Sequence, residues 1–300
     1  MVLGSSTVAG VARAGTRDAL RVVAYHGVPD PEPFSKQMAH LAEAYRPVSG
    51  AHVTAAWSAK KRLPANAVWV TFDDGRPDVV RNALPELKRW DIPATLFVVA
   101  GVLDTTEPFW WEIVERAVAA GVVSDGATLG RLKLAPDDLR REEVSSIGHA
   151  LSAGAGSWEP QLTTSDLERW LSAGMEVGNH SWDHPCLNNC SEDVQRDQVH
   201  RAHDRLSSLV GEPVCLFAYP NGNFSKPVDD ELRRLDYSAG LLFDHRLARL
   251  SGNPLAMSRL RIDSQVELAR FKAIVSGAHP ALFAAQRKAS ALVKRYAASA

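Results

Sequence analysis

Two adjacent carboxylates close an apolar run in the first third of the chain, Val68 to Gly75 (VWVTFDDG). The residues from Val68 to Phe72 are mainly β-branched or aromatic, which is typical of a strand buried on both faces. Packing gives no reason for Asp73 and Asp74 to follow such a strand, because a buried charge needs a partner or a metal to offset its desolvation. The stretch therefore indicates either a functional site or an ordinary Asp-Gly turn.

The segments around this run have the order of a parallel α/β protein. Further buried strands are predicted at 21–25 and 94–99, and amphipathic helices at 34–45 and 77–90. Strand, helix and strand at this spacing form a βαβ unit with parallel strands and a right-handed crossover. In such folds the functional side chains lie at the carboxyl ends of the strands, where His26 and Asp73 both stand.

The same alternation returns in the second half of the chain. Strands are predicted at 175–178, 214–219, 238–243 and 258–262, helices at 191–209 and 228–235, and a mainly helical tail from 266. Residues 103–173 hold too little continuous apolar sequence for a core of their own, so we expect an insertion there after the third strand. The predicted division is an N-terminal extension at 1–20, a barrel-like domain at 21–280 and a helical tail at 281–300.

Composition excludes several classes of function. The 300 residues carry a formal net charge of -1, so no general attraction to nucleic acid or to an anionic membrane is expected. The opening residues lack the order of a secretory signal, and no apolar run approaches the roughly 20 residues of a membrane helix. Three cysteines argue against a disulfide framework, and we expect a cytoplasmic protein. Cys186 and Cys190 are separated by three residues, whereas structural zinc sites typically use two.

Two histidines, His180 and His184, follow the predicted strand at 175–178. Neutral imidazole binds divalent metals, and a spacing of four brings two rings to one side of a turn. With one carboxylate they would form an Asp-His-His site with open positions for water and substrate. An isolated pair can also be one surface residue and one cap. That interpretation becomes weaker when the aspartate pair and the histidine pair both stand at strand ends of one parallel sheet.

The segments from Thr71 to Gly75 (TFDDG) and from His180 to His184 (HSWDH) together resemble two motifs of the polysaccharide deacetylases, the NodB-homology group of carbohydrate esterases (family 4). Four further stretches are similar to family segments: VAYHGV at 23–28, LPEL at 84–87, IPATLF at 92–97 and FAYPNG at 217–222. The resemblance covers about 21–262. It implies a distorted (β/α)7-type barrel and hydrolytic removal of an acetyl group from an acetylated sugar.

The resemblance also implies roles for single residues. Asp74, His180 and His184 would hold a divalent metal, usually zinc, with Co²⁺ or Ni²⁺ as alternatives, and Asp73 would be the general base. A bound dication lowers the pKa of its water, so a nearby carboxylate can take the proton as the water attacks. The turn at Tyr219, Pro220 and Asn221 would contact substrate, with a backbone N–H near Asn221 for the oxyanion.

The chain departs from the family pattern in two places. We find no late Leu-x-His motif for the general acid, and we expect His26 to replace it; the alternative is a buried histidine bonded to its own loop. The family arginine that orients the catalytic aspartate is replaced by Ala218. Arg259 could reach the same carboxylate, unless Arg259 and Arg261 are only surface charges.

Trp110 and Trp111 leave two further alternatives open. They can staple the core or form a wall on which a sugar stacks. For the whole protein, the competing functions are an amidase on a linear, non-sugar C–N bond and an inactive barrel that binds glycan. The intact Asp73, Asp74, His180 and His184 argue against the inactive barrel.

Overall fold

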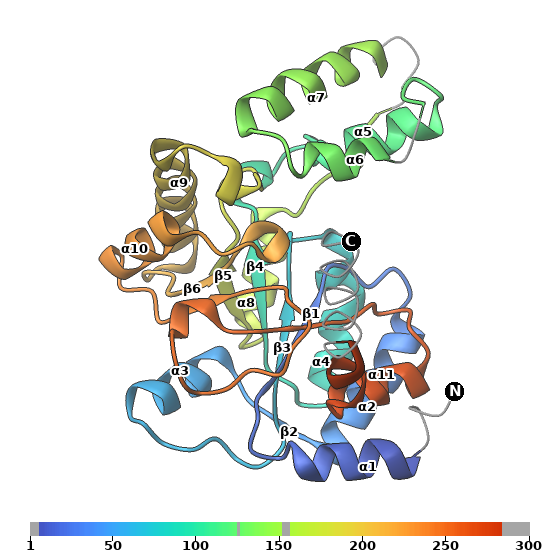
Figure 1. Cartoon of the computed structure of the whole chain (residues 1–300), viewed down its shortest axis with the longest axis vertical. Helices are drawn as coiled ribbons and strands as arrows, with labels where there is room; N and C mark the ends of the chain where they lie inside the picture. The colour runs from blue at the N-terminus through green and yellow to red at the C-terminus, as the bar shows by residue number, and fades with distance from the viewer. Residues whose placement is uncertain (1–5, 125–126, 152–156, 284–300) are drawn as a thin grey trace, which may run out of the picture.

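Parallel strands form one curled sheet at the centre of the protein (Figure 1). The structure is a computed structural model that describes residues 6–124, 127–151 and 157–283. In this part of the chain the strands lie in the order β7-β6-β5-β4-β3-β1-β8, all pairings are parallel, and β2 pairs with β3. The bounds are β1 Arg21–Tyr25, β2 Arg46–Pro47, β3 Ala67–Phe72, β4 Ala94–Val98, β5 Glu176–Asn179, β6 Leu216–Ala218, β7 Ala239–Leu241 and β8 Leu260–Arg261. The predicted distorted (β/α)7-type barrel is confirmed.

The long strands are apolar throughout because both of their faces are covered. In β3, Trp69 belongs to an inner cluster, whereas Val68, Val70 and Phe72 belong to the larger cluster beneath the helices. Successive side chains of a strand point to opposite faces, so one continuous apolar run supplies both clusters. The inner cluster fills the barrel, and it leaves the ends of the strands as the place for polar side chains.

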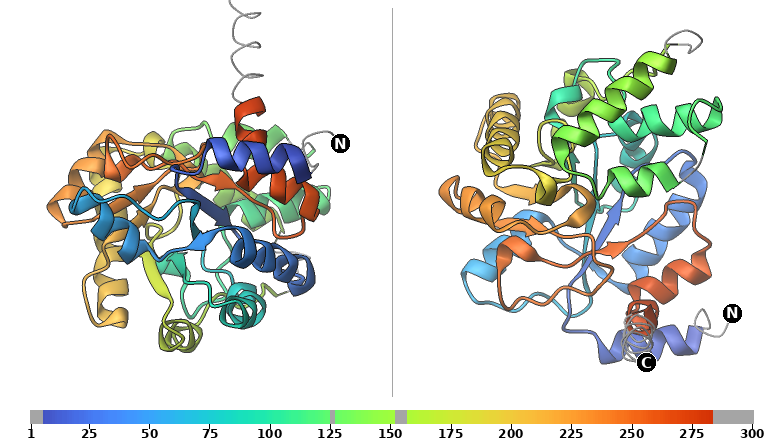
Figure 2. Two further views of the ribbon diagram at one scale, coloured as in Figure 1. Left: turned by 90° about the horizontal axis from the view of Figure 1, so that it is seen from below. Right: turned by 45° about the horizontal axis from the view of Figure 1, so that its top comes forward.

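Helices surround the sheet on its outer face (Figure 2). On this face lie α2 Pro31–Ala44, α4 Leu84–Arg89, α8 Thr164–Ser172, α9 Glu192–Val210, α10 Lys226–Arg234 and α11 Leu268–Val275. Helix α3 Gly50–Ser58 instead packs Val53 and Trp57 on the inner cluster, and α1 Ser6–Gly15 packs on α11. The helix predicted at 77–90 is a π turn at Val79–Ala83 that continues into α4. Pro85 has no N–H to give to the preceding turn, which explains the change in winding.

Three helices project above the carboxyl ends of the strands: α5 Trp110–Ala119, α6 Ala127–Leu132 and α7 Asp137–Leu151 (Figure 1). Their buried side chains form a separate cluster, which corrects the expectation that this region has too little apolar sequence for a core. The apolar residues recur at helical spacing rather than as a continuous run, so they were not evident as a core. By contrast, α8 lies inside the predicted insertion 103–173 but packs with Leu167 and Trp170 on the main core.

The two ends of the described chain meet below the sheet. Helix α1 contacts α11, and the two lie side by side in both views of Figure 2. Arg21 is fully buried between them and donates to the backbone oxygens of Thr16 and Val275. Most of the predicted tail 281–300 lies outside the described residues. Among the described helices, none has the length and hydropathy needed to cross a membrane.

Candidate metal centre and active site

Asp73 and Asp74 leave β3 in different directions. The N–H of Asp73 continues the strand ladder by donating to Tyr25 O at 2.8 Å, whereas Asp74 has φ 72°, in the left-handed region. Gly75 follows with φ 82°. Left-handed backbone is uncommon for a residue with a side chain and clusters at functional sites. The reversal allows two adjacent carboxylates to face different partners.

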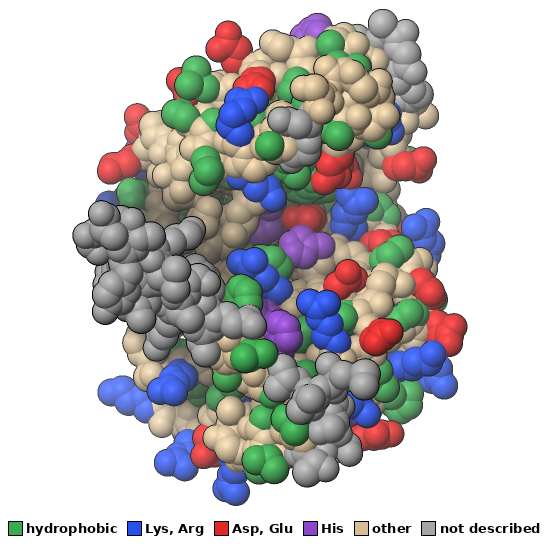
Figure 3. Space-filling model, turned by 45° about the vertical axis from the view of Figure 1, so that its right-hand side comes forward, with side chains coloured by type: hydrophobic (Ala, Val, Ile, Leu, Met, Phe, Trp, Pro, Cys, Tyr) green, Lys and Arg blue, Asp and Glu red, His purple; other side chains and the backbone are tan. Residues whose placement is uncertain are grey.

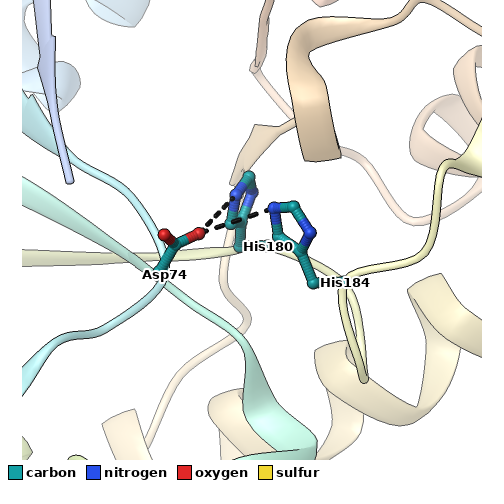
Figure 4. Close-up of side chains that lie close together, drawn as sticks. All are labelled: Asp74, His180 and His184. Carbon is teal, nitrogen blue, oxygen red and sulfur yellow. Dashed lines mark ion pairs between the residues drawn. The ribbon is translucent and has the colours of Figure 1, made fainter. Parts of the chain in front are cut away.

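The side chain of Asp74 faces His180 and His184 (Figure 4). All three residues are buried, and Asp74 Oδ1 lies 3.5 Å from the Nε2 atom of each histidine. Ligand atoms around a tetrahedral ion at about 2.1 Å lie roughly 3.4 Å from one another. Asp74 Oδ1 accepts no hydrogen bond from the described residues although it is buried. One carboxylate and two imidazoles with an unsatisfied buried oxygen fit a divalent metal of the zinc type.

The two histidines are oriented in different ways. The Nδ1 atom of His180 lies 2.8 Å from Ala218 O and donates to it in the neutral ring, so Nε2 is the free lone pair toward Asp74. The Nδ1 atom of His184 is buried without a partner among the described residues. Its ring lies 4.6 Å from Trp111 and 4.8 Å from His180, measured between centroids. Packing therefore positions the second imidazole.

Burial and neighbouring charges favour the ligand forms of two of these groups. Burial, with the charge of His180 adding to it, lowers the pKa of His184 to about 3. Burial alone would raise the pKa of Asp74, but the nearby imidazoles, His180 first, more than offset it and lower this pKa. His180 has a raised pKa, since the carboxylates of Asp73 and Asp74 outweigh its desolvation. A neutral His184 and an ionised Asp74 are the forms that bind a cation.

Asp73 pairs with Arg259 instead of joining this group. Nη1 and Nη2 of Arg259 each lie 2.7 Å from one oxygen of the carboxylate, and Nε donates to Leu242 O at 2.7 Å. Both side chains are buried, so Arg259 is not a surface charge. Burial would raise the pKa of Asp73, but Arg259 and His180 outweigh it and lower this pKa. The arginine missing at Ala218 thus has a counterpart that approaches from the segment before β8.

A cavity of about 480 Å³ opens beside these groups, in the hollow below the helical insertion where Figure 3 shows histidine and basic side chains. His26 lines it, exposed, with its ring 5.0 Å from that of Phe243. It is therefore not the buried histidine of the alternative interpretation. The lining residues are His26, Asp73, Asp74, Trp111, Glu115, Leu129, Lys133, Leu134, His180, His184, Asn221, Gly222, Asn223, Phe243 and Arg261.

The structure corrects three of the expected substrate contacts. Tyr219 and Pro220 are buried and do not line the cavity, whereas Asn221 does, with φ 56°. Ala218 points into the barrel, so alternation turns Tyr219 toward the helices. Trp110 is buried in the core of the insertion, and Trp111 lines the cavity with its ring stacked on Phe109 at 4.5 Å. Of the tryptophan pair, Trp110 is thus a core residue and Trp111 alone lies at the cavity.

Several lining residues carry no sequence signal. Glu115, Leu129, Lys133 and Leu134 come from the insertion and meet the barrel ends only in the folded chain.

Cys186 and Cys190 are both free, and Cys186 Sγ accepts a hydrogen bond from Asn221 Nδ2 at 3.3 Å. The described residues therefore show no second metal site at this cysteine pair.

Sequence comparison finds proteins named as deacetylases among the curated relatives of this chain. The chain is 36% identical over 86 residues to the peptidoglycan-N-acetylmuramic acid deacetylase PdaC of Bacillus subtilis (strain 168), a match that covers 29% of this chain and 17% of PdaC. It is 43% identical over 42 residues to the poly-beta-1,6-N-acetyl-D-glucosamine N-deacetylase of Staphylococcus aureus (strain MSSA476), a match that covers 14% of each protein. The chain spans less than two thirds of the length of the first curated relatives it matches.

A solved structure shares the fold. The Streptococcus pyogenes deacetylase PplD, in complex with acetate, superposes with a TM-score of 0.61 at 21% identity, covering 86% of this chain and 97% of PplD. The profile of the polysaccharide deacetylase family matches residues 60–129 and 133–240, which is more than half of the chain and includes Asp73, Asp74, His180 and His184. The chain therefore belongs to the polysaccharide deacetylase family.

Proposed function

We propose that the protein is a metal-dependent hydrolase that removes the acetyl group from an N-acetylated sugar. One observation carries the proposal: a buried Asp-His-His group and an arginine-paired aspartate line the same cavity. Both curated relatives described above are named as deacetylases of N-acetylated sugars, which supports the substrate class.

Asp74, His180 and His184 would hold the metal, with zinc as the first candidate and Co²⁺ or Ni²⁺ as alternatives. When bound, the metal supplies an activated water and polarises the acetyl carbonyl. Asp73 takes the proton of that water as general base, and Arg259 holds its carboxylate in place by two hydrogen bonds.

Two further groups of the cavity complete the reaction. A leaving amine needs a proton, and His26 is the exposed imidazole at the cavity wall that we assign as the general acid. The developing oxyanion needs a fixed donor, which we assign to a backbone N–H of the turn at Asn221. Trp111 and Phe243 offer aromatic surface to the sugar.

The test measures acetate release from N-acetylated oligosaccharides. We expect activity to disappear with a chelator and to return with Zn²⁺ or Co²⁺. Asp73→Asn and His26→Gln should each retain the metal yet lower kcat, by roughly 10²- to 10⁴-fold. The control is Asp91→Asn, because Asp91 lies at the opposite, amino-terminal end of β4 and outside the cavity. Full activity in Asp73→Asn, or in the metal-free protein, would contradict the proposal.

A further inference from the structure

The loop that carries two of the proposed metal ligands has strained backbone. Ser181 has φ 69° and His184 has φ 57°, both in the left-handed region that residues with side chains rarely adopt. Such conformations persist only where surrounding contacts determine them. The question is which contacts hold this loop, and in particular His184, whose Nδ1 atom has no hydrogen-bonding partner among the described residues.

The barrel holds the first half of the loop. Asn179 Oδ1 accepts from the N–H of Ser181 at 2.7 Å. Gln198 Oε1 accepts from Trp182 N–H at 3.1 Å and from Asp183 N–H at 3.0 Å. The ring of His180 is oriented by Ala218 O. Within the loop, Ser181 Oγ accepts from the N–H of His184 at 3.1 Å, so this half leaves the carbonyl of His184 unheld.

The insertion holds the second half. Trp110 Nε1 donates to His184 O at 3.1 Å, in a buried position. Arg141 of α7 binds both carboxylate oxygens of Asp183, at 2.9 and 3.0 Å. Cys186 is part of the apolar cluster of the insertion, and Asn189 Nδ2 donates to Lys133 O and Ala135 O at 3.0 and 3.1 Å.

The first turn of α5 also contacts the loop that carries Asp74, the third proposed ligand. Glu112, two residues after Trp110, forms an ion pair with Arg76, which is two residues after Asp74. Trp111 lies between these contacts with its ring against His184. Three consecutive residues of α5 therefore touch both loops that carry the Asp-His-His group.

We propose that the helical insertion is a structural part of the metal centre, in which Trp110 and Arg141 are positioning residues for His184. Trp110 fixes the peptide of His184, and Arg141 fixes the preceding residue through a two-point contact. The inference rests on the proposed metal site at Asp74, His180 and His184. It assigns to the insertion a role in metal affinity that is separate from any contact with substrate.

The test measures Co²⁺ affinity by competition with a chromophoric chelator, together with the visible absorption of the bound ion, which reports its coordination geometry. Trp110→Phe removes one N–H but keeps an aromatic ring beneath Arg140, which stacks on it at 4.8 Å. Arg141→Met removes the contact with Asp183. We expect each variant to bind Co²⁺ about 10-fold more weakly, with an altered spectrum, as for other groups that orient metal ligands.

Glu143→Gln is the matched control, because Glu143 pairs with Arg131 inside the insertion without touching the loop. It should bind Co²⁺ like the unaltered protein. The side chain of Arg141 is 43% exposed, so we expect its variant to fold even if Trp110→Phe does not, although it also loses the ion pair with Asp137 inside α7. Unchanged affinity and spectrum in Arg141→Met, or in a folded Trp110→Phe, would overturn the inference. If instead the unaltered protein binds Co²⁺ no better than Asp74→Asn does, the metal site itself fails; acetate release plays no part in either result.

Discussion

At the scale of single residues, the pair of Asp73 and Arg259 decides whether the proposed base is usable. Both side chains are buried, and the guanidinium meets the carboxylate through two hydrogen bonds of 2.7 Å. Removing one partner of a buried ion pair strongly destabilises the folded protein. The intact pair, by contrast, adds little stability compared with apolar residues of similar shape. The arginine therefore serves to keep an ionised Asp73 in one orientation.

Arg259→Met should lower the free energy of unfolding by about 3–5 kcal/mol, because it leaves the Asp73 charge buried and unpaired. Arg259→Lys should lower the free energy of unfolding by less, since lysine keeps the charge but not the planar two-point contact. Denaturant unfolding measures both values. The Arg259→Met/Asp73→Asn double variant should recover part of the lost stability. Strictly additive losses would show that the two side chains do not depend on each other.

At the scale of elements, the end of β4 sets the position of the ligand loop. The N–H of Gly101, in the short 3₁₀ turn Ala100–Val102, donates to Trp182 O at 2.6 Å. A Cβ on Gly101 would lie 2.4 Å from that oxygen, closer than real contacts allow. Close backbone approach is what requires glycine here. Two loops that are far apart in the chain thus fit only without a side chain at this residue.

Gly101→Ala should therefore shift the Ser181–His184 loop and reduce both stability and Co²⁺ affinity. Gly148→Ala is the opposite case, because the nearest atom to its Cβ, in Ile113, lies at an ordinary 3.7 Å. Gly148 is inside α7, so alanine should raise the free energy of unfolding by roughly 0.5–1 kcal/mol. Thermal unfolding and metal titration of the two variants check this contrast. A Gly101→Ala protein that is as stable as Gly148→Ala would contradict it.

At the scale of the whole molecule, a histidine contact joins the last barrel strands to the end of the described chain. His245 Nδ1 accepts from the N–H of Arg261 at 3.2 Å, and its Nε2 lies 3.0 Å from His279 Nδ1. In this arrangement Nε2 carries the proton and donates, so His245 is neutral. Burial lowers the pKa of His245 to about 4, and the neighbouring His279 adds to the effect.

The folded protein should lose stability as the pH falls from about 6.5 to about 4. In this window the unfolded chain binds a proton at His245 that the folded chain does not, so acid favours unfolding. His245→Gln should flatten the dependence of Tm on pH. Part of the slope should remain in His245→Gln, since burial lowers the pKa of His40 to about 4 as well. An identical slope in His245→Gln and the unaltered protein would contradict the assignment.

The sequence by itself determined the parallel sheet and the Asp-His-His group. Short apolar runs rich in β-branched and aromatic residues indicate strands covered on both faces, and the carboxyl ends of parallel strands share one edge. The aspartate pair and His180 follow two such strands, β3 and β5, so the meeting of one carboxylate with the histidines was predictable from the strand ends. The choice of Asp74 over Asp73 came from the resemblance to the polysaccharide deacetylases.

Only the tertiary structure decided what supports that group. Arg259 reaches Asp73 across 186 residues, and Trp110 reaches His184 across 74, and neither contact follows a periodic pattern. The direction of Tyr219 depends on the register of a three-residue strand, which composition does not specify. Side chains that end regular elements are predictable because the element fixes their direction. Contacts made by the insertion depend on how two separately packed cores meet, and that is a property of the folded chain alone.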